Sequence, residues 1–93
     1  TVKVNGTQGT DHGTGSVAML MGGAVNGGRV VADWPGLADA ALYENRDLKP
    51  TTGLDAVIGS TLSAHFDLSP QATVQKLFPD VQAARPIQDL VRA

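Results

Sequence analysis

A carboxylate and an imidazole stand side by side near the start of the chain, as Asp11 and His12. One oxygen donor and one nitrogen donor can bind the same divalent metal ion, such as zinc or manganese. Neighbouring side chains converge only where the backbone turns sharply, and the flanking Gly9 and Gly13 permit such a turn. The pair therefore predicts two ligands of a metal site on a loop. In the alternative interpretation, Asp11 accepts backbone hydrogen bonds in a turn and His12 is a partly exposed loop residue.

Two ligands do not complete a metal site, because zinc takes four donors and even a catalytic zinc takes three from the protein. The other residues of suitable type are Asp33, Asp47 and His65. His65 is expected in a helix beside Phe66, where a surface or helix-end role is favoured over metal binding. Either the missing ligands come from outside this chain, or the site does not exist.

The same loop suggests a second binding chemistry. Backbone N–H groups of residues 13–16 could cradle a phosphate. However, an expected strand follows this segment where a phosphate-binding loop is followed by a helix, and the lysine of such loops is absent. Phosphate binding by this loop is therefore disfavoured.

Residues 1–51 are predicted to form a half made of strands and a glycine-rich loop. Most of the 11 glycines lie in this half. Ser16–Val25 is apolar at both odd and even positions, which favours a strand buried on both faces. A buried helix is disfavoured because Gly22 and Gly23 would destabilise it by about 2 kcal/mol. Arg29–Ala32 is expected to be a short returning strand.

Residues 52–93 are predicted to form a helical half, with two helices inside residues 52–79. The buried face of the first helix is expected to comprise its apolar residues at helical spacing: Leu54, Val57, Ile58, Leu62 and Phe66. Ser69 is the predicted N-cap of the second helix, with Pro70 at its first position, and Pro79 ends it. Strands followed by helices indicate an α/β or α+β fold.

Composition excludes several classes of function. Seven Lys and Arg residues against nine Asp and Glu give a net charge of −2 without a basic run, which argues against a nucleic-acid partner. The chain has no cysteine, so disulfides and thiolate metal sites are excluded. The longest apolar run, residues 17–25, is too short to span a membrane. The opening residues carry no signal peptide.

Two further residues attract attention because of their chemistry. Trp34 lies in an Asp-Trp-Pro-Gly turn and is expected to pack over that turn, in preference to stacking on a substrate. Arg46 could bind an anion, but Glu44 and Asp47 are close to it in the sequence. A local surface ion pair, worth under about 1 kcal/mol, is the favoured interpretation.

Several stretches, taken together and in this order, resemble the C-terminal part of the DUF1501 family. They are residues 5–13, 22–28, 33–37 and 42–52, and residues 77–79 match the tail of the same family. The resemblance covers nearly the whole chain, residues 5–93. It implies a bacterial protein of several hundred residues that is exported with a twin-arginine signal, and therefore periplasmic or otherwise exported. Residues 1–93 are then one C-terminal segment of a larger domain.

That family is in turn similar to the alkaline phosphatase and sulfatase superfamily. The similarity implies an α/β fold, in which the chain is the C-terminal fragment of an α/β sandwich: strands and the glycine-rich loop in residues 1–51, and two helices in residues 52–79. In that superfamily an Asp-His pair ahead of a core strand binds a catalytic metal, which points to Asp11 and His12. A later histidine of the superfamily has no match here, since His65 lies in a predicted helix. The nucleophile and the other ligands would lie upstream, so the catalytic residues are unknown.

Two hypotheses of function follow. In the first, the chain is the C-terminal segment of an exported, metal-dependent hydrolase of phosphate or sulfate esters, and is inactive alone. In the second, the parent protein is a non-catalytic binding or scaffold module of the cell envelope that keeps the fold without a complete metal site. The expected partners are the N-terminal part of the parent chain and a second copy of the fragment, because a strand such as Ser16–Val25 without sheet partners leaves an exposed pairing edge.

Overall fold

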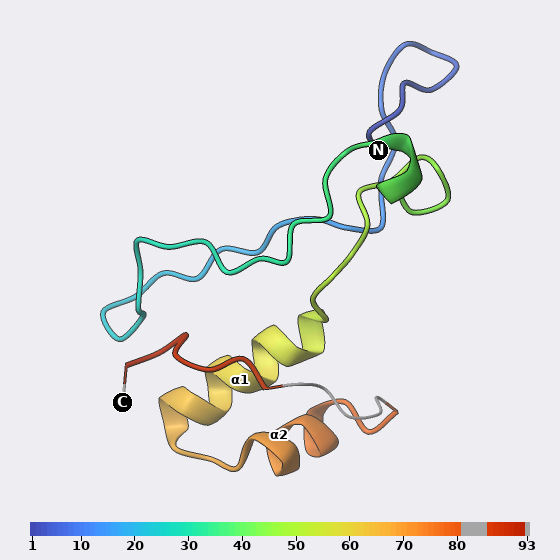
Figure 1. The fold of residues 1–93 in the computed structure, drawn as a ribbon. Coiled ribbons are helices and arrows are strands. Elements are labelled where there is room, and N and C mark those ends of the chain that lie inside the picture. The colour runs from blue at the N-terminus through green and yellow to red at the C-terminus, as the bar shows by residue number, and fades with distance from the viewer. Residues whose placement is uncertain (81–85, 93) are drawn as a thin grey trace. The chain divides into compact units, whose positions relative to one another are not determined.

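The structure is a computed structural model that describes residues 1–80 and 86–92. Its regular elements in these residues are a short 3-10 helix, η1 (Asp39–Ala41), and two α-helices, α1 (Leu54–Phe66) and α2 (Pro70–Leu77) (Figure 1). Both α-helices lie inside the range, 52–79, in which the sequence predicts two. Residues 81–85 and 93 of the expected helical half lie outside the described residues.

The chain divides into two units. The loop unit comprises Thr1–Ala18 and Ala32–Thr51 and contains the Asp-His pair. The helix unit comprises Met19–Val31 and Thr52–Ala93 and contains both α-helices. The boundary therefore differs from the predicted division at residue 51, because residues 19–31 belong with the helices.

Backbone hydrogen bonds between separate segments hold the loop unit together. The N–H of Val2 donates to the carbonyl of Arg46 at 2.9 Å. Tyr43 and Asp47 form an isolated antiparallel bridge, in which each N–H donates to the other residue's carbonyl at 2.9 and 3.0 Å. Leu42, directly before this bridge, is the buried apolar residue of the unit. The N-terminal segment is thereby fixed to the turn at residues 43–47.

The strand expected over Ser16–Val25 does not form. The described residues contain no strand, only isolated bridges, and Figure 1 draws no arrow over this segment. Met19 and Met21 are 80% and 85% exposed, which is the opposite of burial on both faces. The expected strand over Arg29–Ala32 is also absent, and Val30 is exposed. A doubly buried strand needs neighbouring strands at both edges and a covering layer on each face, and the described residues supply none. The α/β class itself stays a prediction.

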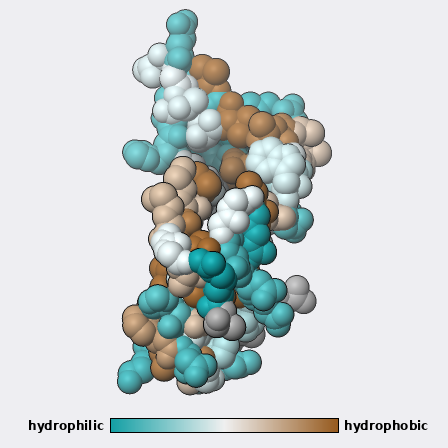
Figure 2. Space-filling view, turned by 90° about the vertical axis from the view of Figure 1, so that its left-hand side faces the viewer, coloured by the Kyte–Doolittle hydropathy of each residue, from teal (hydrophilic) through white to brown (hydrophobic). Residues whose placement is uncertain are grey.

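Apolar side chains consequently lie open to solvent, and brown residues are visible on the face drawn in Figure 2. In the helix unit the end of this segment is paired, because Val25 and Val91 form an antiparallel bridge. The N–H of Asn26 donates to the carbonyl of Leu90 at 3.0 Å, and the N–H of Arg92 donates to the carbonyl of Ala24 at 2.7 Å. No described helix is both long and apolar enough to cross a membrane.

The predicted start of the second helix is confirmed. The Ser69 side chain accepts a hydrogen bond from the N–H of Ala72 at 3.4 Å, and Pro70 occupies the first turn of α2. Proline fits there because its missing N–H would have no partner within the helix. Helix α2 ends at Leu77, two residues before Pro79.

The predicted buried face of α1 is wrong in part, since Val57 and Leu62 are only half-buried and its other residues are exposed. Leu54 and Phe66 are 63% and 61% exposed. The residues that α1 buries are small and lie at helical spacing on a different face: Ala56, Gly59, Ser60 and Ser63. Small residues allow α2 to approach so closely that a Cβ at Gly59 would lie 2.5 Å from Cγ2 of Val74. The Ser60 hydroxyl is satisfied there, since it accepts from the N–H of Ile87 at 2.8 Å.

This contact predicts that Gly59→Ala changes stability with a sign that depends on Val74. In the wild type the added methyl group meets Val74 and costs about 1–3 kcal/mol, against about 1 kcal/mol gained from helix propensity. We therefore expect a net loss of up to about 2 kcal/mol. In a Val74→Ala background the same change should stabilise the protein by about 1 kcal/mol. Urea unfolding followed by circular dichroism measures both, and stabilisation in the wild type would contradict the close packing.

Candidate functional site

Asn5 shapes the loop that carries the Asp-His pair. Its side-chain oxygen accepts from the Thr7 N–H at 3.0 Å, the Thr7 hydroxyl at 2.9 Å and the Gly9 N–H at 3.0 Å. Its backbone N–H donates to the Gly9 carbonyl at 2.8 Å. An asparagine side chain that bonds the backbone two residues ahead is the usual way to close such a turn. A single polar side chain therefore fixes the path of residues 5–9.

The same asparagine orients Asp11. The Asn5 amide nitrogen donates to Oδ1 of Asp11 at 2.8 Å. The backbone of Asp11 is held as well: its N–H donates to the Thr1 hydroxyl at 3.0 Å, and its carbonyl accepts from the Thr1 amino group at 2.8 Å. Asp11 is exposed, and Oδ2 makes no hydrogen bond with the described residues. One carboxylate oxygen is thus oriented and free.

His12 is exposed, and neither ring nitrogen is bonded to a described residue. The two predicted ligands therefore lie next to each other on a loop held from several sides, with donor atoms open to solvent. The alternative interpretation assigned backbone hydrogen bonds to the Asp11 carboxylate, but its bond comes from the Asn5 side chain. It assigned an exposed loop position to His12, which agrees with the structure.

The structure does not gather further ligands around this pair. In residues 1–80 and 86–92, no group of three or more His, Cys, Asp or Glu residues could hold a metal ion. Asp33 is exposed in the loop unit. His65 lies in the last turn of α1, with its ring edge-on to Phe66 at 4.8 Å between ring centres, as the helix-end role predicts. The described donor set, one carboxylate oxygen and one imidazole nitrogen, fits half of a four-coordinate zinc site.

Asp47 is the most deeply buried side chain of the site region, and the sequence did not reveal this. It is 1% exposed. Oδ1 accepts from Nε of Arg46 at 2.7 Å and Oδ2 accepts from the Thr14 hydroxyl at 2.8 Å. A buried carboxylate is tolerated when both oxygens are bonded in this way. The hydrogen bonds from Arg46 and then Thr14 lower the pKa of Asp47 below its ordinary value.

The Arg46–Asp47 pair therefore confirms one part of the prediction and corrects another. Asp47, one of the two expected partners, pairs with Arg46, but the pair does not lie wholly on the surface, because its carboxylate is buried while the Arg46 side chain is 50% exposed. In the sequence, the available signal for the burial of Asp47 was its position directly before Leu48, at the end of a polar turn. Trp34 is largely exposed, and its packing over its own turn stays a prediction.

Two glycines that follow the Asp-His pair, Gly13 and Gly15, lie where residues 13–15 approach residues 47–50. A Cβ at Gly15 would lie 2.6 Å from the carbonyl oxygen of Leu48, and one at Gly13 would lie 3.9 Å from Cγ of Asp47. Residues 13–15 are thus packed against residues 47–50. Asp47 fastens this contact through Thr14, immediately after the predicted ligands.

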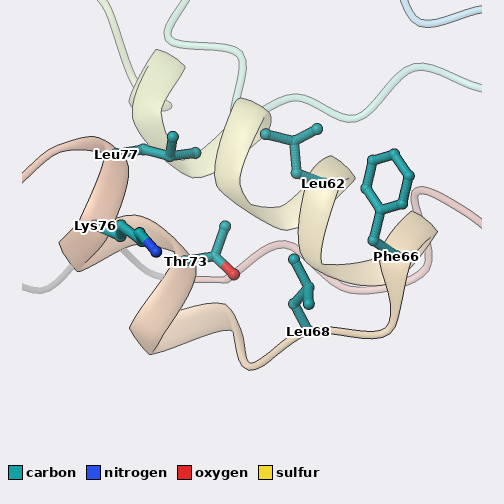
Figure 3. Close-up of a pocket in the computed structure, with 6 residues that line it drawn as sticks. All are labelled: Leu62, Phe66, Leu68, Thr73, Lys76 and Leu77. Carbon is teal, nitrogen blue, oxygen red and sulfur yellow. The ribbon is translucent and has the colours of Figure 1, made fainter.

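A separate hollow lies in the helix unit, between α1 and α2 (Figure 3). It encloses about 280 Å³ and is lined by Leu62, Phe66, Leu68, Thr73, Lys76 and Leu77. In Figure 3, Leu62 and Phe66 come from α1, and Leu68 comes from the connection to α2. The lining is almost wholly apolar and contains none of the predicted ligands. It therefore offers no chemistry of the kind that the Asp-His pair suggests.

Comparison with known proteins gives one result. A family described as "Protein of unknown function (DUF1501)" matches residues 1–78. No curated protein and no solved structure matches the chain. The matched range includes the Asp-His loop, the Tyr43–Asp47 turn and both α-helices.

Proposed function

The chain belongs to the DUF1501 family, and from this premise we propose that it is the C-terminal segment of an exported, metal-dependent hydrolase of phosphate or sulfate esters. In this proposal the parent protein has an α/β fold of the alkaline phosphatase and sulfatase type. A twin-arginine signal directs it to the periplasm. The nucleophile and the remaining ligands come from the preceding part of the parent chain, so the segment alone is inactive.

One observation carries the proposal. Asp11 and His12 are exposed and adjacent in the sequence, and the loop that bears them is held by Asn5, Thr1 and the contact of Gly15 with Leu48. A flexible, unanchored loop would have to be ordered by the metal and would bind it more weakly. Hydrogen bonds to a ligating carboxylate are a regular feature of metal sites. Asn5 supports Asp11 in this way.

Three residues of the loop then have a part in metal binding. Asp11 contributes Oδ2 and His12 a ring nitrogen, while Asn5 keeps Oδ1 occupied and sets the direction of the carboxylate. Asp11 and His12 would hold a divalent ion, which would supply a Lewis acid able to polarise an ester oxygen and to lower the pKa of a water molecule toward about 7. Asp47 and Thr14 hold the base of the loop and touch no reacting atom.

The second candidate function is a non-catalytic binding or scaffold module of the envelope. The described residues contain no third ligand, which favours this candidate. The two functions differ in a property that can be measured directly, because the hydrolase is expected to bind a divalent metal through His12 and the scaffold module is not. Pairing between copies through residues 16–25 stays a prediction under either function.

Metal titration tests the proposal in the longer protein that the hypothesis requires. We expect stoichiometric zinc or manganese binding by calorimetry. Asn5→Ala should weaken it by about 10–100-fold, as for other partners of ligating groups, and His12→Ala by more than that. His65→Ala, on α1, is the matched control and should leave the affinity unchanged. Unaltered metal affinity in His12→Ala, or no metal binding in the wild type, would favour the scaffold function.

A further inference from the structure

The tripeptide Val-Asn-Gly occurs twice in the chain, at residues 4–6 and 25–27. An asparagine that precedes glycine is prone to deamidation, in which the backbone nitrogen of the glycine attacks the side-chain amide carbon. Glycine favours this reaction because it has no side chain to hinder the nitrogen. The two copies match in exposure as well, since both asparagines are half-buried and both glycines are exposed. A difference in their reactivity therefore reflects their hydrogen bonds.

The attacking nitrogen is free only in the first copy. The N–H of Gly6 makes no hydrogen bond with the described residues, whereas the N–H of Gly27 donates to the carbonyl of Val25 at 2.9 Å. That hydrogen bond has to break before the Gly27 nitrogen can attack, and its loss opposes the reaction. The nucleophile therefore favours Asn5 over Asn26.

The attacked amide is also activated only in the first copy. Attack on the amide carbon moves negative charge onto Oδ1. In Asn5 this oxygen accepts three hydrogen bonds, from the Thr7 N–H at 3.0 Å, the Thr7 hydroxyl at 2.9 Å and the Gly9 N–H at 3.0 Å. Donors that already point at an oxygen where charge develops stabilise the transition state. Oδ1 of Asn26 accepts no hydrogen bond from the described residues.

The leaving nitrogen does not distinguish the two copies, because each Nδ2 donates one hydrogen bond. Nδ2 of Asn5 donates to Oδ1 of Asp11 at 2.8 Å, and Nδ2 of Asn26 donates to the carbonyl of Asp89 at 2.7 Å. The attacking nitrogen and the oxygen that gains charge thus both favour reaction at Asn5.

We propose that Asn5 is a modification site, at which the folded loop promotes deamidation, while the same tripeptide around Asn26 is protected. The Gly6 nitrogen forms a bond to Cγ of Asn5 as the Cγ–Nδ2 bond breaks. The proton that the Gly6 nitrogen loses leaves with Nδ2, as ammonia. Water then opens the five-membered imide at one of its two carbonyl groups and leaves aspartate or isoaspartate at position 5.

Deamidation of Asn5 detaches Asp11. Both products carry a carboxylate in place of the side-chain amide, so the donor to Oδ1 of Asp11 is lost and two like charges face each other. Isoaspartate also adds one carbon atom to the backbone and so alters the turn of residues 5–9. The reaction thereby releases a predicted metal ligand from its support. That consequence rests on the proposed function, whereas deamidation itself does not.

Tandem mass spectrometry of the full chain, incubated at neutral pH without metal, measures deamidation at both sites in one sample. We expect Asn5 to react at least roughly fivefold faster than Asn26, because its oxygen is surrounded by donors. In urea, which unfolds both turns, the two rates should become similar, since the tripeptide is the same. Asn26 reacting as fast as Asn5 in the folded protein, or a ratio of rates that urea leaves unchanged, overturns the inference.

Substitutions of Thr7 test the activated oxygen separately. Thr7→Val removes the hydroxyl donor and keeps the N–H donor, so it should slow deamidation of Asn5 several-fold and leave that of Asn26 unchanged. Thr7→Ser keeps a hydroxyl group and is the matched control, with the wild-type rate expected. An Asn5 rate in Thr7→Val that equals the wild-type rate would contradict activation by this donor. Because no metal is present, failure of the metal site leaves this test unaffected.

Discussion

Asp47→Ala will disorder the loop unit more than any other single substitution of a polar residue in it. The change leaves Thr14 and Nε of Arg46 without their acceptor and opens space beneath Gly13. Removing one partner of a buried, charged hydrogen-bond network costs far more than removing an exposed ion pair. We expect the hydrogen-bonded amides of Val2, Tyr43, Arg46 and Asp47 to lose protection from hydrogen exchange. The amides of α1 should keep theirs.

Acid should reproduce part of this effect. The hydrogen bonds from Arg46 and Thr14 hold the pKa of folded Asp47 below the unfolded value of about 3.9. The contribution of Asp47 to stability is therefore complete above that unfolded value and is lost as the pH falls through the lowered folded value. Asp47→Asn is the control, because it keeps the size of the side chain and cannot titrate. An acid transition of the loop unit that is the same in Asp47→Asn would contradict this assignment.

Gly15→Ala should destabilise the loop unit by about 1–3 kcal/mol, the usual cost of overpacking. Its Cβ would meet three backbone atoms: the carbonyl oxygen and carbon of Leu48 at 2.6 and 3.2 Å, and the Pro50 nitrogen at 3.3 Å. Backbone atoms cannot rotate away as a long side chain can, so the two segments must separate. Urea unfolding read by NMR signals of residues 43–50 measures the loss.

Gly6→Ala is the matched control for this substitution. Nothing lies within 4 Å of a Cβ at Gly6, which is in the same loop. It should change stability by less than about 0.5 kcal/mol. Equal losses from the two substitutions would mean that the contact with Leu48 does not explain the loss at Gly15.

Local sequence signals predicted the second half of the chain well. The Ser69-Pro70 start and the stop before Pro79 depend only on backbone donors and the geometry of proline, so they can be predicted without knowledge of the rest of the fold. The buried face of α1 could not be predicted in the same way. Leu54 and Phe66 were predicted to be buried because they are hydrophobic. The residues that α1 buries are Gly59 and its small neighbours, because they allow the close approach of Val74. This burial depends on the partner helix.

The first half shows a different limit. The apolar pattern of residues 16–25 favours a buried strand. Burial of a strand requires neighbouring strands, and the described residues contain none. For the candidate site, the sequence identified Asp11 and His12 by residue type. It did not identify Asn5, because the hydrogen bond of Asn5 to Asp11 depends on a local turn with positive φ at Gln8. It did not identify the burial of Asp47, because this depends on contact with Thr14, which is distant in the sequence.

Anomalous diffraction at the zinc edge, from crystals of the longer protein grown with zinc, tests the account most directly. We expect a zinc peak about 2.0–2.2 Å from both a ring nitrogen of His12 and Oδ2 of Asp11. The other ligands should come from outside residues 1–93. A zinc peak elsewhere in the protein, with these two side chains turned apart, would contradict the metal site and leave only the membership of the family.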